Sequence, residues 1–163
     1  MVYLLDADTL IRAANTFYRL KRVGPVWDWL QKQGSLGNVK IPIEQYEEIT
    51  VGNKDDELVK WLKQPDVKKD LLLDEEADPA TVAKVTLDGY GNLDEKGVEE
   101  VGRDPFLISY GYEDPKNRTI ATFENSAPSK KGKNRKVPDV CDDLKVKWCT
   151  LFDVIEELDF TIG

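Results

Sequence analysis

The 163-residue chain contains no histidine. Its absence excludes Ser-His-Asp hydrolysis, nuclease chemistry built on paired histidines, and zinc sites with histidine ligands. If the protein is an enzyme, its carboxylates must carry out the chemistry. A group of carboxylates without histidine suits a hard, oxygen-seeking cation such as Mg²⁺ or Mn²⁺.

Cysteine and long apolar runs are also scarce. Cys141 and Cys149 have seven residues between them, which fits neither a redox pair nor a zinc knuckle. We interpret them as small buried residues of a protein from a reducing compartment. No signal peptide precedes Val2, and no apolar run approaches the ~20 residues that a membrane helix needs. We therefore expect a cytoplasmic protein with no membrane partner.

Acidic residues outnumber basic ones, 31 to 23, and give a net charge of -8. This excess argues against broad electrostatic attraction to nucleic acid, but it says little about a local basic patch. The length is typical of one domain, here residues 1–163, which is large enough to bury a single core without metal or disulfide bonds.

The stretch Val2–Leu5 is apolar and leads directly into Asp6. This pattern predicts a short strand that is buried on both faces and ends in a carboxylate. Ligands of open α/β sheets bind beyond the carboxyl ends of the strands, so Asp6 is a candidate catalytic residue. An Asp after a strand is also a common turn former or helix N-cap, which is the alternative interpretation.

Strands and helices alternate along the rest of the chain. This alternation predicts an α/β fold, a three-layer α/β/α sandwich with a mainly parallel sheet of about five strands. The strands are expected at 2–5, 39–42, 71–73, 119–124 and 146–149. The final helix is expected to begin at a capping box formed by Thr150 and Asp153.

Four further acids fall where strand ends and helix starts meet. Glu124 ends a predicted strand, Asp104 and Asp139 begin helices, and Glu48 lies within one. In a parallel sheet these positions share one edge, where carboxylates can hold a divalent ion and support cleavage of a phosphodiester. Acids at helix starts are often simple caps, and for Asp139 that alternative stays open.

The order of these motifs resembles PIN-domain ribonucleases across nearly the whole chain. The motifs are the strand that ends at Asp6, Ile41-Pro42 followed by Glu48-Ile49, Asp104-Pro105-Phe106-Leu107-Ile108, and Thr122-Phe123-Glu124. Pro138-Asp139-Val140-Cys141 resembles an element near the end of an uncharacterised PIN-like branch.

The resemblance implies a PIN-like fold and a Mg²⁺- or Mn²⁺-dependent endoribonuclease that acts on single-stranded or structured RNA. Asp6, Glu48, Asp104 and Glu124 match the four family acids, and Asp6, Asp104, Glu124 and Asp139 are the expected metal ligands. Many family members are toxins of toxin–antitoxin pairs, so an antitoxin protein and a second copy of the chain join RNA as expected partners.

The sequence departs from the family pattern in two places. The fourth acid is usually Asp, whereas this chain has Glu124, and Gly111 stands where the family more often has a small apolar residue. Because Glu is longer than Asp, the backbone at Glu124 would have to lie about one methylene farther from the site. The second loosens the helix that follows Asp104.

Two features are assigned to RNA. Thr122 is expected to orient a metal-bound water, although a Thr inside a strand end is also an ordinary β-branched core residue. The loop after Glu124 carries five cations in seven positions, which predicts a local patch for the RNA backbone. A merely solvated loop is the alternative. The cations are Lys130, Lys131, Lys133, Arg135 and Lys136.

Two other functions are consistent with parts of the sequence. Asp6-Ala7-Asp8 also resembles the opening of haloacid-dehalogenase-type phosphatases, but that family wants Thr or Val where this chain has Leu10. Its late pair of adjacent acids belongs at a strand end, whereas Asp142-Asp143 fall in a predicted helix. The other rival is a PIN-like binding module without catalysis, against which the intact set of acids argues.

Overall fold

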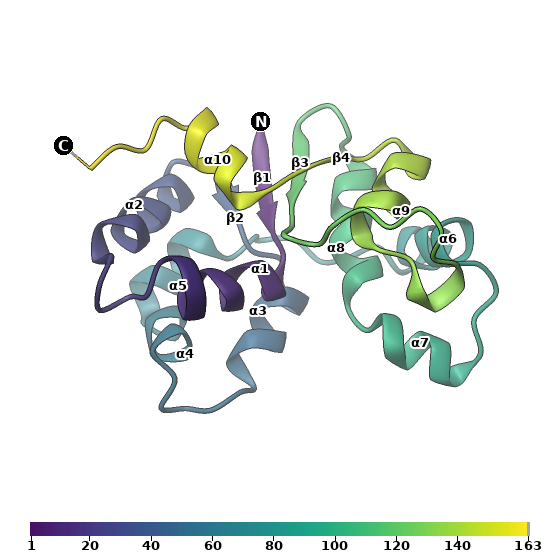
Figure 1. Cartoon of the computed structure of the whole chain (residues 1–163), viewed down its shortest axis with the longest axis horizontal. Helices are drawn as coiled ribbons and strands as arrows, with labels where there is room; N and C mark the ends of the chain where they lie inside the picture. Colours follow the sequence, from purple (N-terminus) through teal and green to yellow (C-terminus); the bar gives the residue numbers. More distant parts are fainter. Residues whose placement is uncertain (163) are drawn as a thin grey trace.

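The computed structural model describes residues 1–162, so Gly163, the last residue of the predicted domain, lies outside the described part. One sheet runs through the centre of the molecule (Figure 1), and all its strand pairs are parallel. The strand order is β2-β1-β3-β4. The strands are β1 (Val2–Leu5), β2 (Val39–Lys40), β3 (Arg118–Ala121) and β4 (Lys147–Cys149).

Helices cover both faces of the sheet (Figure 1), which confirms the predicted three-layer α/β/α arrangement. On one face lie α1 (Ala7–Arg12), the π-helix Ala13–Phe17, α2 (Gly24–Ser35), α3 (Ile43–Thr50), α4 (Glu57–Leu62), α5 (Pro65–Leu71) and α10 (Leu151–Glu157). On the other lie α6 (Pro79–Tyr90), α7 (Glu95–Val101), α8 (Asp104–Glu113) and α9 (Val137–Leu144). The capping box predicted at Thr150 and Asp153 is present and begins α10.

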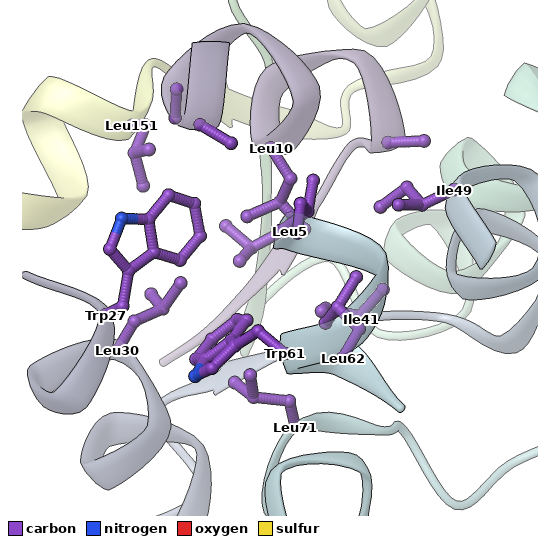
Figure 2. Close-up of a cluster of buried hydrophobic side chains, with 14 of the residues drawn as sticks. Leu5, Leu10, Trp27, Leu30, Ile41, Ile49, Trp61, Leu62, Leu71 and Leu151 are labelled. Atoms are coloured by element: carbon purple, nitrogen blue, oxygen red, sulfur yellow. The ribbon is translucent and has the colours of Figure 1, made fainter. Parts of the chain in front are cut away.

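The two faces of the sheet bury separate apolar clusters because successive strand residues point in opposite directions. Leu5 packs with Trp27, Trp61 and other side chains of the first helical layer (Figure 2). Its neighbour Leu4 packs with the second layer instead. Each residue is fully buried, as the unbroken apolar run before Asp6 predicts for a central parallel strand.

The prediction of a fifth strand at 71–73 is wrong, because the described sheet has four strands. Pro65 begins α5, and this helix continues through Leu71. Leu72 then forms only an isolated parallel bridge with Ile41. The chain turns into α3 at Ile43, so the pairing stops there.

The direction of the connections changes between β1 and β3. The chain leaves β1 through α1 and α2 to reach β2 on one side, and it leaves β3 through α9 to reach β4 on the other. The two central strands therefore border a topological switch point, where the loops diverge and open a crevice at their carboxyl ends.

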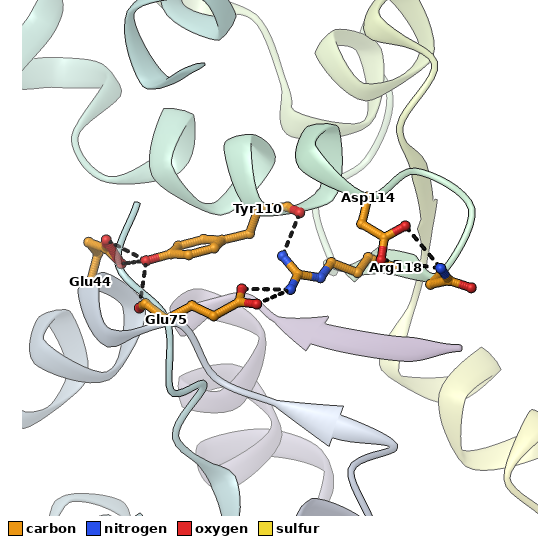
Figure 3. A network of polar contacts seen from close by, with 6 residues as sticks. Glu44, Glu75, Tyr110, Asp114 and Arg118 are labelled. Atoms are coloured by element: carbon orange, nitrogen blue, oxygen red, sulfur yellow. Dashed lines mark hydrogen bonds and ion pairs between the residues drawn. The ribbon is translucent and has the colours of Figure 1, made fainter. Parts of the chain in front are cut away.

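A network of polar contacts ties α3 to α8 and to β3 (Figure 3). The Tyr110 hydroxyl in α8 donates to both carboxylate oxygens of Glu44 in α3, at 2.9 and 3.1 Å. Arg118 in β3 donates to the backbone oxygen of Tyr110 at 3.0 Å and pairs with Glu75 at 2.6 Å. These contacts fix the relative position of the two helices that carry Glu48 and Asp104.

Across residues 1–162, every helix is too short or too polar to cross a lipid bilayer.

Candidate active site

Asp6 lies at the carboxyl end of β1, directly beside the end of β3. The Asp6 N–H donates to the backbone oxygen of Ala121 at 3.1 Å. The Thr122 hydroxyl donates to Asp6 Oδ2 at 3.1 Å and accepts the Glu124 N–H at 3.1 Å. Thr122 is fully buried, so it positions the two acids and does not face a substrate, in contrast to the direct role predicted for it.

A buried glutamine connects Asp6 to Asp104. Gln45 Oε1 accepts the N–H of Ala7 at 2.9 Å, and its Nε2 donates to the backbone oxygen of Arg103 at 3.2 Å. One side chain thus holds the peptides next to both acids. Gln45 was not among the residues predicted from the sequence, although it is fully buried.

The site contains several carboxylates close enough to affect one another. Burial, together with Glu124 and Asp8, raises the pKa of Asp6 to about 7, against the opposing hydrogen bond from Thr122. Burial also raises the pKa of Asp104 to about 8, with further contributions from Asp6 and Glu124 and smaller ones from Glu48 and Asp8. No ion pair within residues 1–162 involves Asp6 or Asp104.

Glu48 and Asp8 border this group from the solvent side. Burial is the main cause that raises the pKa of Glu48, Arg103 opposes it, and Asp8 adds to it. Asp8 is exposed in the first turn of α1. Its negative charge raises the pKa of Asp6, Glu48 and Asp104, although Asp8 was not among the predicted site residues.

Glu124 and Asp139 both make contacts that shape the chain between β3 and α9. The Val137 N–H, at the first turn of α9, donates to Glu124 Oε2 at 2.7 Å. Asp139 accepts the Ala127 N–H at 2.8 Å through one oxygen and the Ser126 hydroxyl through the other. Because both Asp139 oxygens already hold the loop, we assign this residue to positioning and leave it out of the proposed set of metal ligands.

The donor set fits a divalent cation in its chemistry. Hard cations take carboxylate oxygens, and neither the buried Asp6 nor the partly buried Asp104 has a cationic partner among the described residues. Within the described residues, however, no three acids stand in a ready-made ligand arrangement. A cation would therefore have to draw the side chains inward against their mutual repulsion.

Comparison with known families places the chain. A family model described as "Domain of unknown function (DUF4411)" matches residues 3–162. The chain belongs to the DUF4411 family. Neither the curated proteins nor the solved structures contain a significant match to it.

The basic loop of this DUF4411 domain divides into residues with different roles. A polar hollow of about 390 Å³ is lined by Asp104 and Glu124 together with Lys130, Lys133, Arg135 and Lys136. Arg135 donates to the backbone oxygen of Gly89 at 2.6 Å and pairs with Asp143, so its guanidinium joins α6 to α9. Lys131 is exposed and does not line this hollow.

Aromatic rings lie on the other side of Glu124. Phe123 packs against Phe17 and Phe152, with ring centroids 5.4 and 4.9 Å away, and these two partners are 42% and 43% exposed. The Arg12 guanidinium carbon sits 5.5 Å from the Phe123 ring centroid. The π-helix that ends at Phe17 shifts the helical register and brings the Phe17 ring partly into solvent.

Proposed function

We propose that this DUF4411 domain is a Mg²⁺- or Mn²⁺-dependent endoribonuclease that hydrolyses RNA phosphodiester bonds. One observation carries the proposal: carboxylates from β1, α8 and the end of β3 are grouped at the switch point of a parallel sheet without compensating cations. Ionised carboxylates in such surroundings are costly unless a cation offsets them. The β1–β3 crevice is also where open α/β sheets bind their ligands.

Asp6, Asp104 and Glu124 would hold the cation, with Glu48 and Asp8 next to them. A divalent ion in such a site supplies a Lewis acid for the phosphoryl oxygens and lowers the pKa of a bound water. The protein's part is to position the ligands. Gln45 and Thr122 fix the backbone beside them and the orientation of Asp6, and the protons held by the raised-pKa carboxyls must leave as the cation arrives.

RNA is proposed as the substrate because groups that bind phosphates and bases flank the acids, despite the net charge of -8. Lysines of the basic loop lie on one side of Glu124 and exposed aromatic rings on the other. Stacking on aromatic rings together with lysine contacts to the backbone is the usual way in which proteins hold single strands. The toxin role implied by the PIN resemblance remains part of the same proposal.

The test is cleavage of a mixed RNA pool by the purified protein, with Mn²⁺ or Mg²⁺ added and with EDTA as the reference. We expect Asp6→Asn and Asp104→Asn each to reduce the cleavage rate more than about 100-fold, because each removes a charged ligand. Glu76→Gln is the matched control, since Glu76 is an exposed acid outside this group. Wild-type activity in either Asn variant, with Glu76→Gln equally active, would remove that carboxylate from the proposed site.

A further inference from the structure

Tyr90 at the end of α6 carries an unusual hydroxyl. The residue is 3% exposed. Among the buried side-chain polar atoms of residues 1–162, its oxygen alone has no hydrogen-bond partner. Buried tyrosine hydroxyls normally find one, because an unpaired donor away from water costs free energy. The unused donor therefore points to a group that the protein does not itself supply.

Tyr90 lines the 390 Å³ hollow that also contains Asp104 and Glu124. Burial raises the pKa of the Tyr90 hydroxyl, and the negative charges of Asp104 and Glu124 in the same lining raise it further. The volume falls within the range of roughly 300–1,000 Å³ that small-molecule sites occupy. The hollow is thus large enough for one nucleotide beside the proposed reaction centre.

Four of the remaining lining residues are cationic, and Glu100, Val101 and Asn134 complete the lining. Lys130 and Lys136 line the hollow and take part in no ion pair among the described residues. Lys133 lines it too and is paired with Glu100 at 2.9 Å. Lysine ammonium groups and a phenolic hydroxyl together are suited to the oxygens of a phosphate.

A second hollow of about 370 Å³ continues the path on the other side of the acids. It is lined by Asp8, Arg12 and Phe123. Glu124 and Lys136 line both hollows, so the two adjoin at these residues. A single strand lying along both would pass from the aromatic rings, across the acids, to Tyr90.

We propose that the hollow at Tyr90 is a subsite for the phosphate of a nucleotide next to the bond that is cleaved. The Tyr90 hydroxyl donates a hydrogen bond to a phosphate oxygen, and Lys130 and Lys136 neutralise its charge. This inference rests on the proposed nuclease function. It adds a substrate-positioning residue from α6, which contributes none of the acids.

The probe is uridine 3′,5′-bisphosphate, which has a phosphate on each side of one nucleoside and no internucleotide bond to cut. Its binding is measured by isothermal titration with Mg²⁺ present. Tyr90→Phe removes only the unpartnered oxygen, so we expect unchanged or slightly higher thermal stability and about tenfold weaker binding, the size of one hydrogen bond to a charged group. Tyr112→Phe is the matched control and should bind the probe as the wild type does.

The charged residues give two further variants with effects of opposite sign. Lys130→Ala combined with Lys136→Ala should weaken binding of the bisphosphate, whereas Lys116→Ala, an exposed lysine before β3, should not. Glu100→Gln should strengthen binding a few-fold, because Lys133 loses the carboxylate that competes with the phosphate. An unchanged affinity in Tyr90→Phe, or a weaker one in Glu100→Gln, would overturn the subsite.

The outcomes separate this inference from the nuclease proposal. If the wild type cleaves RNA but Tyr90→Phe does not weaken bisphosphate binding, the subsite is refuted and the nuclease proposal is retained. If bisphosphate binding depends on Tyr90 but the wild type cleaves no RNA, the nucleotide phosphate site is supported and the nuclease proposal is refuted. Binding of inorganic phosphate as tightly as the bisphosphate would show a simple anion site and overturn the nucleotide assignment.

Discussion

Replacing Asp6 with Asn should make the metal-free protein more stable at pH 8, and by a much smaller margin at pH 5. Asp6 is 4% exposed, and its pKa is raised from 3.8 to about 7. Between these two pH values the folded state keeps a proton that the unfolded state has released. The free energy of unfolding therefore falls as pH rises through this window and levels off above about pH 7.

The size of the effect follows from the same pKa values. A rise from 3.8 to about 7 corresponds to roughly 4 kcal/mol at pH 8. Asn carries no charge, and its side-chain oxygen can still accept the Thr122 hydroxyl. For a chain of this length each kcal/mol shifts the melting temperature by ~2–4 °C. Side-chain rotation and water relieve part of the cost of burying the charged Asp6. We therefore expect the melting temperature of Asp6→Asn to exceed that of the wild type by roughly 5–10 °C at pH 8.

The assay is thermal unfolding of the wild type and the Asn variant in EDTA at pH 5, 6, 7 and 8. Asp28→Asn, an exposed acid of α2, is the matched control and should show no such dependence on pH. Adding Mn²⁺ at pH 8 should then raise the melting temperature of the wild type but not that of Asp6→Asn. The ion stabilises the folded wild type by about 2.7 kcal/mol when it is at 100 times its dissociation constant. A difference between wild type and Asp6→Asn that stays constant from pH 5 to pH 8 would refute the argument.

Two further predictions concern residues next to the ligands. Glu124→Gln should keep the fold, because the amide oxygen can still accept the Val137 N–H, but it should lose RNA cleavage. Glu124→Asp should keep measurable cleavage. Equal cleavage rates for the two variants would show that charge at this position does not matter. An ionised Glu in Gln45→Glu cannot donate to the backbone oxygen of Arg103 and adds a buried acid. We therefore expect the free energy of unfolding, measured by chemical denaturation, to fall by about 1–3 kcal/mol and Mn²⁺ to bind more weakly. An unchanged Mn²⁺ titration would contradict a positioning role for Gln45.

The sequence was sufficient to predict the fold class, because the strongest local signals agree with the tertiary structure. The apolar run before Asp6 predicts a strand that is buried on both faces, and the capping box at Thr150 predicts the start of a helix. Strand 71–73 was mispredicted for a reason that is not local. Leu71 completes a helix begun by Pro65, and the available partner strand ends at Pro42.

The site was predictable only where a residue's chemistry follows from its place on a strand or helix end. The sequence located Asp6 at a strand end and Asp104 at a helix start, and the strand order brings them to the same edge. It did not show that both Asp139 oxygens are used by the preceding loop, because those contacts depend on the path of residues 125–127. Gln45 and Tyr90 escaped notice because a long-range hydrogen bond, or the lack of one, leaves no periodic signal.

Three polar groups of the proposed site, Asp6, Asp104 and Tyr90, work against folding. Burial raises the pKa of Asp6 and Asp104, which means that their charged forms make the folded state less stable. Tyr90 adds an unpaired hydroxyl a short way along the same hollow. Leu or Phe at these positions would satisfy the core without such costs, so packing alone does not account for them. A cation between the carboxylates and a phosphate on the hydroxyl would offset both costs at once.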